Sequence, residues 1–266
     1  MGILNVTPDS FFDGGFHFQL DQAIEHGLRM AREGADIIDI GGESTRPFSD
    51  PLPIEEELRR VIPVIKALSQ QIDIPISIDT YKSEVARQAI EGGASMVNDI
   101  SALRFDPAMA ALVAEAGVPI ILMHMKGTPQ DMQVSPTYED LLGEILQFLD
   151  DAVQKASARG IRRENIIVDP GIGFGKSFDD NLKIIRELHV FSSLGQPVLV
   201  GTSNKSFVGH VLGLPVESRE TGSMATIAAA VMNGADIVRA HNVKAARETV
   251  RMIDAIQSGS SKPKAL

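Results

Sequence analysis

Three short apolar segments of this chain carry, at their ends, side chains that could bind or activate a substrate. PISID ends at Asp79, SMVND contains Asn98, and NIIVD ends at Asp169. A carboxylate removed from water needs a partner, so the two Asp residues could serve in acid–base chemistry or accept hydrogen bonds from a ligand. The amide of Asn98 can both donate and accept. Each residue alone could simply cap a neighbouring helix, but the three together favour a binding site.

Basic side chains follow the later apolar segments. Lys205 lies in GTSNKSF, and Arg239 and His241 lie in VRAHN, where alternation along an extended chain points both side chains the same way. A guanidinium binds phosphate oxygens through two parallel N–H groups. Arg46 adds a further cation, although an ordinary surface ion pair explains it equally well, and His241 alone could be structural. With the carboxylates, these residues predict a ligand that has N–H donors at one end and a diphosphate at the other.

Other kinds of active site find little support. The segment DPGIGFGK (169–176) is rich in glycine but lacks the P-loop spacing, so we interpret it as a loop whose backbone approaches a flat ligand. The sequence has no Cys, no GxSxG motif and no His/Asp/Glu spacing typical of zinc hydrolases. Met123 and His124 could line a pocket or belong to the core.

Eight Ile/Val-rich runs must position these side chains. Continuous apolar runs are typical of parallel strands buried on both faces, and a helix-like segment separates most of them. We therefore predict an α/β fold with one (β/α)8 barrel, whose active site lies at the C-terminal strand ends. Two helical segments, 206–213 and 218–234, predict an extra helix between the seventh and eighth strands. The runs are GILNV, DIIDIGG, PISID, SMVND, PIILMH, NIIVD, PVLVG and DIVRAH, beginning near residues 2, 36, 75, 96, 119, 165, 197 and 236.

Size and composition fit one barrel. The chain has 266 residues, of which 44% are hydrophobic, so we expect a barrel over residues 1–258 and a disordered tail over 259–266. A formal net charge of −10 argues against nonspecific nucleic-acid binding. No apolar run approaches the roughly 18–20 residues that span a bilayer, so no membrane partner is expected. The lack of Cys fits a reducing cytoplasm, where we expect the protein to act. The chain begins inside the first predicted strand, so an upstream natural start or a trimmed sequence is expected.

Eight collinear motifs resemble the bacterial dihydropteroate synthase family over nearly the full length of the chain. The resemblance implies a TIM barrel that joins p-aminobenzoate to 6-hydroxymethyl-7,8-dihydropterin diphosphate, releases pyrophosphate and uses Mg²⁺. It also implies a homodimer, the common state of the family. The motifs are GILNVTPDSF (2–11), GGESTRP (41–47), SIDTYKSEVA (77–86), VNDIS (97–101), LMHMKGTP (122–129), DPGIGFGK (169–176), NKS (204–206) and RAH (239–241).

The resemblance further implies a role for each matching residue. Because the attacking amine belongs to the substrate, no nucleophilic side chain is needed, and catalysis is expected to come from stabilising the departing negative charge. Residues implied to bind the pterin are Asp79, Asn98, Met123, Asp169, Phe174, Gly201, Lys205 and Arg239. Residues implied to bind p-aminobenzoate and the diphosphate are Asn5, Thr45, Arg46, Pro47, Ser206, Arg239 and His241. Asn5 is the implied Mg²⁺ contact, and Arg46, Lys205, Arg239 and His241 are the implied catalytic residues.

Four positions depart from the family pattern. Phe12 stands where the family has Ser, Phe48 where it has Gly, Asn204 where it has Arg, and Asn242 where it has Asp. None of them is a pterin or diphosphate contact named above. We therefore expect an intact pterin site and an altered second-substrate site, in which Phe12 and Phe48 narrow the p-aminobenzoate pocket and weaken the binding of sulfonamides.

Two alternatives stay open. A methyltetrahydrofolate–corrinoid methyltransferase on the same barrel would need the pterin residues, but it would not need the cationic rim of Arg46, Lys205, Arg239 and His241. A paralogue could instead bind pterin without turning it over, and its only support is the four departures. A pyrophosphate-release assay with both substrates separates these hypotheses.

Overall fold

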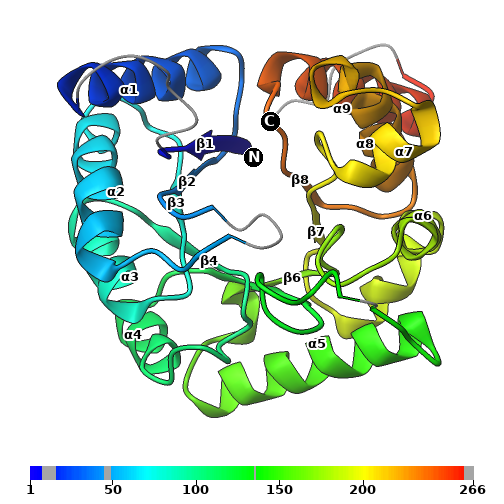
Figure 1. The fold of residues 1–266 in the computed structure, drawn as a ribbon, viewed down its shortest axis with the longest axis horizontal. Coiled ribbons are helices and arrows are strands. Elements are labelled where there is room, and N and C mark those ends of the chain that lie inside the picture. The colour runs from blue at the N-terminus through cyan, green and yellow to red at the C-terminus, as the bar shows by residue number, and fades with distance from the viewer. Residues whose placement is uncertain (8–15, 45–48, 135, 261–266) are drawn as a thin grey trace.

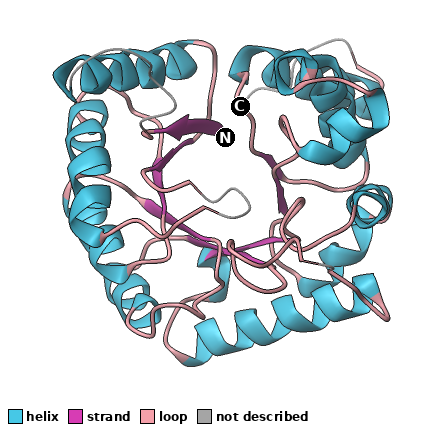
Figure 2. Cartoon of the chain, in the orientation of Figure 1, coloured by secondary structure: helices cyan, strands magenta, loops and turns pink. Residues whose placement is uncertain are grey.

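The computed structural model describes residues 1–7, 16–44, 49–134 and 136–260. Across these residues, eight parallel strands form a ring with helices outside it, which confirms the predicted barrel (Figures 1 and 2). The strands are β1 (Gly2–Asn5), β2 (Ile38–Gly41), β3 (Ile76–Asp79), β4 (Met96–Asp99), β5 (Ile120–Met123), β6 (Ile166–Asp169), β7 (Leu199–Val200) and β8 (Ile237–Val238).

Backbone pairing closes the ring. Strands β1 to β6 form one sheet in sequence order, and β7 pairs with β8. A bridge between Val168 and Val198 joins β6 to β7, and a second between Gly2 and Ala240 joins β8 back to β1. At the second junction Ile3 N donates to the carbonyl of Ala240 over 3.0 Å. The last strand therefore lies beside the first, although more than two hundred residues separate them.

Each strand is followed by a helix, and the segment between β7 and β8 contains two helices. Between β7 and β8 the chain forms both α7 and α8, which confirms the predicted extra helix. The helices are α1 (Phe16–Arg32), α2 (Ile54–Ser69), α3 (Ser83–Glu91), α4 (Met109–Ala116), α5 (Leu141–Ala158), α6 (Phe178–Arg186), α7 (Ser206–Leu212), α8 (Glu220–Met232) and α9 (Val243–Ser258). Short 3₁₀ turns lie at Arg163–Asn165, Leu188–Leu194 and Val216–Ser218.

Side-chain alternation along the strands separates the core from the mouth of the barrel. Outward residues such as Ile38, Ile40 and Ile78 pack beneath the helices and are fully buried. Inward residues of four strands form an apolar cluster inside the barrel, below the strand ends and separate from the main core under the helices; we call this cluster the plug. Because strand side chains repeat every two residues, the next inward residue after each plug residue lies at the C-terminal mouth. The plug consists of Met96, Ile121, Ile167 and Leu199.

Local contacts set the limits of two helices. Helix α5 begins at Leu141, because the side chain of Asp140 accepts a hydrogen bond from Gly143 N and caps the helix. Helix α6 ends at Arg186, and the chain continues as a 3₁₀ turn. There Asn233 donates to the carbonyl of Ile185 over 2.9 Å, which supplies a partner at the helix end.

Helix α9 ends at Ser258, and Gly259 follows with a φ of 62°, the left-handed conformation common after helices. Among the described residues, no helix is both long and apolar enough to span a bilayer.

Candidate active site at the mouth of the barrel

Ion pairs join the acidic and basic residues at the strand ends. Arg239 Nε donates to Asp39 Oδ2 over 2.6 Å, and its Nη2 donates to Asp79 Oδ2 over 2.8 Å. Asn98 Nδ2 donates to the same Asp39 oxygen over 2.9 Å. The sequence suggested carboxylates inside and cations on a separate rim, but the folded chain places Arg239 in direct contact with two carboxylates.

Asp39 is a functional candidate that is absent from the sequence-based predictions. It lies in the middle of β2 between two buried isoleucines, and its side chain is fully buried. A signal was available, because a charged residue within an otherwise apolar buried strand needs partners that the strand cannot supply. Side chains two residues apart in a strand face the same side. Asp39 therefore faces the same side as Gly41, which pairs with Asp79 in the adjacent strand.

Asp169 combines a local structural contact with an unusual ionisation. Its Oδ1 accepts a hydrogen bond from Gly171 N over 2.7 Å, so one oxygen of the carboxylate stabilises the loop after β6 and does not cap a helix. Burial raises the pKa of Asp169 to about 6, although that hydrogen bond and the charge of Lys205 oppose the shift. Burial also raises the pKa of Asp79, while the charge of Arg239 lowers it. Carboxylates with shifted pKa values that lie together at the strand ends are typical of functional sites.

Lys205 lies on the same side of the mouth. Its Nζ is 4.2 Å from the centre of the Phe174 ring, a cation–π contact that fixes both side chains. Burial, with the neighbouring charge of Arg239, lowers the pKa of Lys205 to about 8, while Asp169 and Asp79 raise it. The ammonium therefore stays largely protonated at neutral pH.

The glycine-rich loop after β6 packs its backbone against the loop after β5. Gly171 has a φ of 72°, and a Cβ at this position would lie 1.9 Å from the carbonyl oxygen of His124. Gly175 has a φ of 64°, and its Cβ would lie 2.5 Å from the carbonyl oxygen of Lys126. The glycines are thus required for contact between the two loops, and this contact holds Asp169 and Phe174 at the mouth.

Met123 and His124 face opposite sides of the barrel wall. Met123 packs with Ile100 and Met125, and Phe174 lies against this cluster, so Met123 forms part of the mouth. His124 turns outward, its ring 4.8 Å from that of Phe148 in α5, so for this residue the core interpretation is correct. Its Nδ1 lies 2.9 Å from the Nζ of buried Lys176. Burial lowers the pKa of His124 to about 2 and that of Lys176 to about 7.

The remaining predicted contacts lie around the rim. His241 is exposed, and its Nδ1 is 2.9 Å from Ser203 Oγ. Ser206 is exposed at the start of α7, and Asn5 is partly buried at the end of β1. Gly201 directly follows β7, and a Cβ at this position would be in ordinary van der Waals contact with Arg239 Cβ at 3.8 Å. The predicted contacts Thr45, Arg46 and Pro47, like the departures Phe12 and Phe48, lie outside the described residues.

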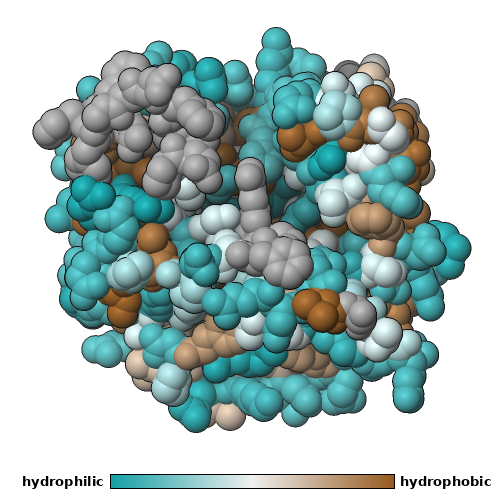
Figure 3. All heavy atoms as spheres, in the orientation of Figure 1, coloured by the Kyte–Doolittle hydropathy of each residue, from teal (hydrophilic) through white to brown (hydrophobic). Residues whose placement is uncertain are grey.

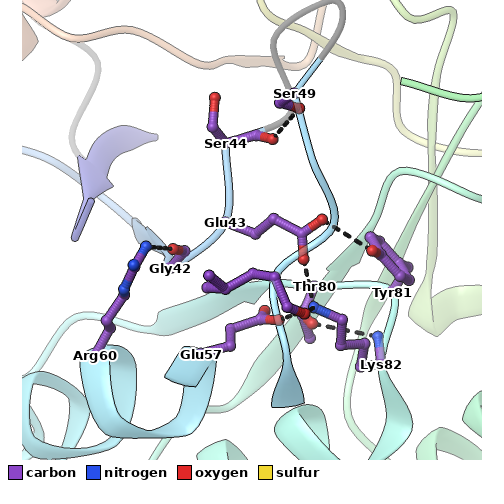
Figure 4. A network of polar contacts seen from close by, with 10 residues as sticks. Gly42, Glu43, Ser44, Ser49, Glu57, Arg60, Thr80, Tyr81 and Lys82 are labelled. Atoms are coloured by element: carbon purple, nitrogen blue, oxygen red, sulfur yellow. Dashed lines mark hydrogen bonds and ion pairs between the residues drawn. The ribbon is translucent and has the colours of Figure 1, made fainter. Parts of the chain in front are cut away.

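A buried ion-pair network holds the described ends of the loop after β2 (Figure 4). Lys82 Nζ forms ion pairs with Glu43 and Glu57, and it donates to the carbonyl of Leu52 over 2.7 Å. Tyr81 donates its hydroxyl hydrogen to Glu43 over 2.8 Å. The network therefore ties both sides of this loop to α2 and to the start of α3. No local sequence pattern indicates this network, because its members come from four separate segments.

Asn204, one of the two departures within the described chain, has a conformational explanation. It has a φ of 59°, a left-handed conformation that Asn tolerates better than most residues. Its backbone N donates to Ser223 Oγ over 3.0 Å, and Arg219 donates to its carbonyl over 3.2 Å. The substitution therefore suits the turn before α7.

Asn242, the other departure, caps α9, and its replacement should reduce stability. Its Oδ1 accepts from Ala245 N over 3.0 Å, and its Nδ2 donates to Glu220 over 2.7 Å. We expect Asn242→Ala to lower the free energy of unfolding by about 1 kcal/mol, as measured by urea denaturation. Asn242→Asp keeps the cap but faces Glu220 with a second carboxylate, so its stability should lie between the two. Equal stability of Asn242→Ala and the unsubstituted protein would contradict this role.

Carboxylates, histidines and amides are also the groups that could hold a metal ion. Within the described chain, no three His, Cys, Asp or Glu side chains are grouped as a metal site. Mg²⁺ is commonly bound by one or two protein oxygens together with substrate phosphates and water. Asn5 lies at the end of β1, and its side chain offers one amide oxygen of the kind that Mg²⁺ accepts.

Comparison with known proteins agrees with this geometry. Residues 1–241 match a family described as "Pterin binding enzyme". The chain is 50% identical over 257 residues to the dihydropteroate synthase of Synechocystis, covering 96% of this chain and 89% of that protein. The Xanthomonas albilineans dihydropteroate synthase bound to 4-aminobenzoic acid superposes with a TM-score of 0.92 at 46% identity, covering 97% and 92% of the two chains. Its complex with 7,8-dihydropteroate superposes with a TM-score of 0.89 at 44% identity, covering 97% and 93%.

Proposed function

The chain belongs to the pterin-binding enzyme family, and on this premise we propose that it is a transferase of folate biosynthesis. It condenses 6-hydroxymethyl-7,8-dihydropterin diphosphate with p-aminobenzoate and yields 7,8-dihydropteroate and pyrophosphate. The observation that most directly supports this proposal is a cluster of polar side chains at one end of the barrel, formed by Asp39, Asp79, Asn98 and Arg239. The full-length similarity to proteins named dihydropteroate synthase supports the same reaction.

The proposed pterin site is the acidic half of the mouth. Asp79, Asn98 and Asp169 offer oxygen acceptors to the N–H groups along one edge of the ring. Met123 and Phe174 supply apolar walls, and Gly201 leaves room for the ring beside Arg239. Lys205 contacts the ring from the side of Phe174.

The proposed reaction forms a C–N bond and breaks a C–O bond at the methylene carbon of the pterin substrate. The amine nitrogen of p-aminobenzoate supplies the electron pair, the diphosphate leaves with the C–O pair, and the nitrogen loses one proton. Arg239, His241, Ser206 and Asn5 would bind the diphosphate, and Arg46 and Lys205 would add positive charge. Thr45 and Pro47 would contact p-aminobenzoate. Asp79 and Asp169 favour positive charge that develops on the methylene carbon as the C–O bond weakens.

Mg²⁺ is part of the proposal. Asn5 would offer one amide oxygen, and the diphosphate and water would complete the coordination. When bound, Mg²⁺ would neutralise charge on the departing diphosphate. Turnover that persists unchanged after chelation with EDTA would contradict this requirement.

Acid should weaken pterin binding. An ionised Asp169 accepts hydrogen bonds from ring N–H groups more strongly than the neutral acid does, and burial raises its pKa to about 6. We therefore expect affinity for the pterin diphosphate to be highest near pH 8 and to fall by at least about tenfold per unit below pH 6. Protonation of Asp79 would act in the same direction. Calorimetry from pH 5 to 8 measures the profile. In Asp169→Asn the affinity should be weaker and the decline shallower, and an unchanged steep decline would remove Asp169 from this role.

A pyrophosphate-release assay with both substrates and Mg²⁺ tests the function. Release that requires p-aminobenzoate supports condensation, and the pteroate product should appear in equal amount. Tight pterin binding without release would favour a binding protein, the second alternative. The control variant is Arg87→Ala, which removes only exposed ion pairs on α3 and should keep wild-type turnover. A corrinoid methyltransferase is disfavoured because Lys205, Arg239 and His241 are all retained near the mouth.

A homodimer is also proposed. Exposed apolar side chains gather on the helices that follow β7 and β8, as the upper right of Figure 3 shows. They include Val211, Leu212 and Leu214 near α7, and Met252 and Ile256 on α9. If a second copy covers this surface, Ile256→Glu should shift the protein from dimer to monomer in light scattering. A monomeric unsubstituted protein would contradict the proposal. The cytoplasmic location stays a prediction from the sequence.

A further inference from the structure

Resting on the proposed function, we propose that Asp39 is a positioning residue of the pterin site. Its buried carboxylate determines which side of the Asn98 amide meets the ligand and holds the Arg239 guanidinium across the mouth. Asp39 is not proposed to touch the substrate. It acts through Asn98 on β4 and through Arg239, which directly follows β8.

The position of Asp39 is unfavourable for the fold alone. It lies two residues before the end of β2. Of the residues at the same place in β1, β3, β5 and β6, three are apolar: Ile3, Ile121 and Ile167. The exception is Ser77, which pairs with Asp39 across β2 and β3. Within the described chain, neither Asp39 Oδ1 nor Ser77 Oγ has a hydrogen-bond partner, although both are buried. Since an ion pair at such a site commonly adds little stability over apolar packing, the carboxylate is better explained by what it orients.

The contact with Asn98 sets the polarity of the amide. An ionised carboxylate only accepts hydrogen bonds, so the amide must turn its Nδ2 toward Asp39, as the 2.9 Å contact shows. Oδ1 is then left as an acceptor for the ligand. Without Asp39, the amide could rotate and present either its oxygen or its NH₂ group. Asp39 thus makes Asn98 an acceptor, which suits the N–H donors on the edge of a pterin.

The contact with Arg239 fixes the guanidinium at two points. Asp39 accepts from Nε and Asp79 accepts from Nη2, over 2.6 and 2.8 Å. Within the described residues, Nη1 makes no such contact and is left as a donor for an anion. Loss of Asp39 would leave Asp79 as the single anchor, and the guanidinium could rotate about that contact.

An exchange of the two side chains tests the polarity argument. Asn98→Asp alone places two carboxylates face to face, so affinity for the pterin diphosphate should fall at least a hundredfold in calorimetry. Asp39→Asn alone leaves two amides of undetermined orientation and should lower affinity for the pterin diphosphate about tenfold. In the double variant Asp39→Asn/Asn98→Asp, the amide at position 39 donates and the carboxylate at position 98 accepts from the ligand. We therefore expect the double variant to bind at least tenfold more tightly than Asn98→Asp.

Steady-state kinetics separate positioning from a general loss of structure. In Asp39→Asn the KM for the pterin diphosphate should rise about tenfold, while the KM for p-aminobenzoate stays within twofold of wild type. The role of Asp39 would be overturned if the affinity losses of the two single variants simply added in the double variant. It would also be overturned if the KM values for both substrates rose together. The proposed function is judged separately, from pyrophosphate release by the unsubstituted protein. The exchange is judged by calorimetry, which needs no turnover.

Discussion

Replacing Arg239 with Met is expected to lower turnover by roughly 10²–10³ and the free energy of unfolding by about 3 kcal/mol. The kinetic loss follows from removing one donor that stabilises the departing diphosphate. The stability loss follows because Asp39 and Asp79 would remain buried without their cation. This stability loss is at the low end of the range for breaking a buried ion pair, because 19% of the Arg239 side chain is exposed. Initial rates and urea denaturation at pH 7.5 measure the two effects.

Dependence on pH identifies the cause of the stability loss. Without the guanidinium, the pKa of Asp79 should rise further above its already elevated value. The carboxyl can then become neutral as the pH falls, so the destabilisation should shrink between pH 7.5 and pH 5. Asp39→Asn/Asp79→Asn in the Arg239→Met background should restore stability but not turnover. A destabilisation that is constant with pH would indicate lost packing rather than unpaired charge.

Replacing Gly171 with Ala is expected to lower pterin affinity at least a hundredfold and to destabilise the protein by about 2–4 kcal/mol. The added Cβ would lie 1.9 Å from the carbonyl oxygen of His124, and the residue would keep a φ of 72°. Neither side can easily yield, because His124 N donates to the Asp169 carbonyl and Gly171 N donates to the Asp169 carboxylate. The loop must shift, and Asp169 and Phe174 shift with it. Calorimetry and thermal unfolding measure both effects.

Gly195 provides the matched control. Its φ is 67°, close to that of Gly171, but a Cβ there would meet nothing within 4 Å. Gly195→Ala should therefore incur only the left-handed conformational cost of about 1–2 kcal/mol and keep full pterin affinity. Equal affinity of the two variants would show that contact between the loops after β5 and β6 does not organise the site.

Much of the site follows from local pattern. Parallel strands with two-residue alternation, each ending in a polar residue, place Asp79, Asn98 and Asp169 at one end of any barrel that they form. The repeated strand–helix order indicated that barrel, and the two helical segments after residue 205 indicated the extra helix. These conclusions needed no knowledge of which strands touch.

Local sequence pattern could not show which of these side chains contact one another. The Asp39–Arg239 pair spans 200 positions, and it forms only because closure of the ring brings β8 beside β1 and β2. His124 likewise follows the same strand as Met123, yet it faces α5 and Lys176 rather than the mouth. The sequence determined that Arg239 and His124 lie at strand ends, because periodicity is a property of each strand alone. Tertiary structure decided which charges meet, because a contact depends on the closure and stagger of the whole barrel.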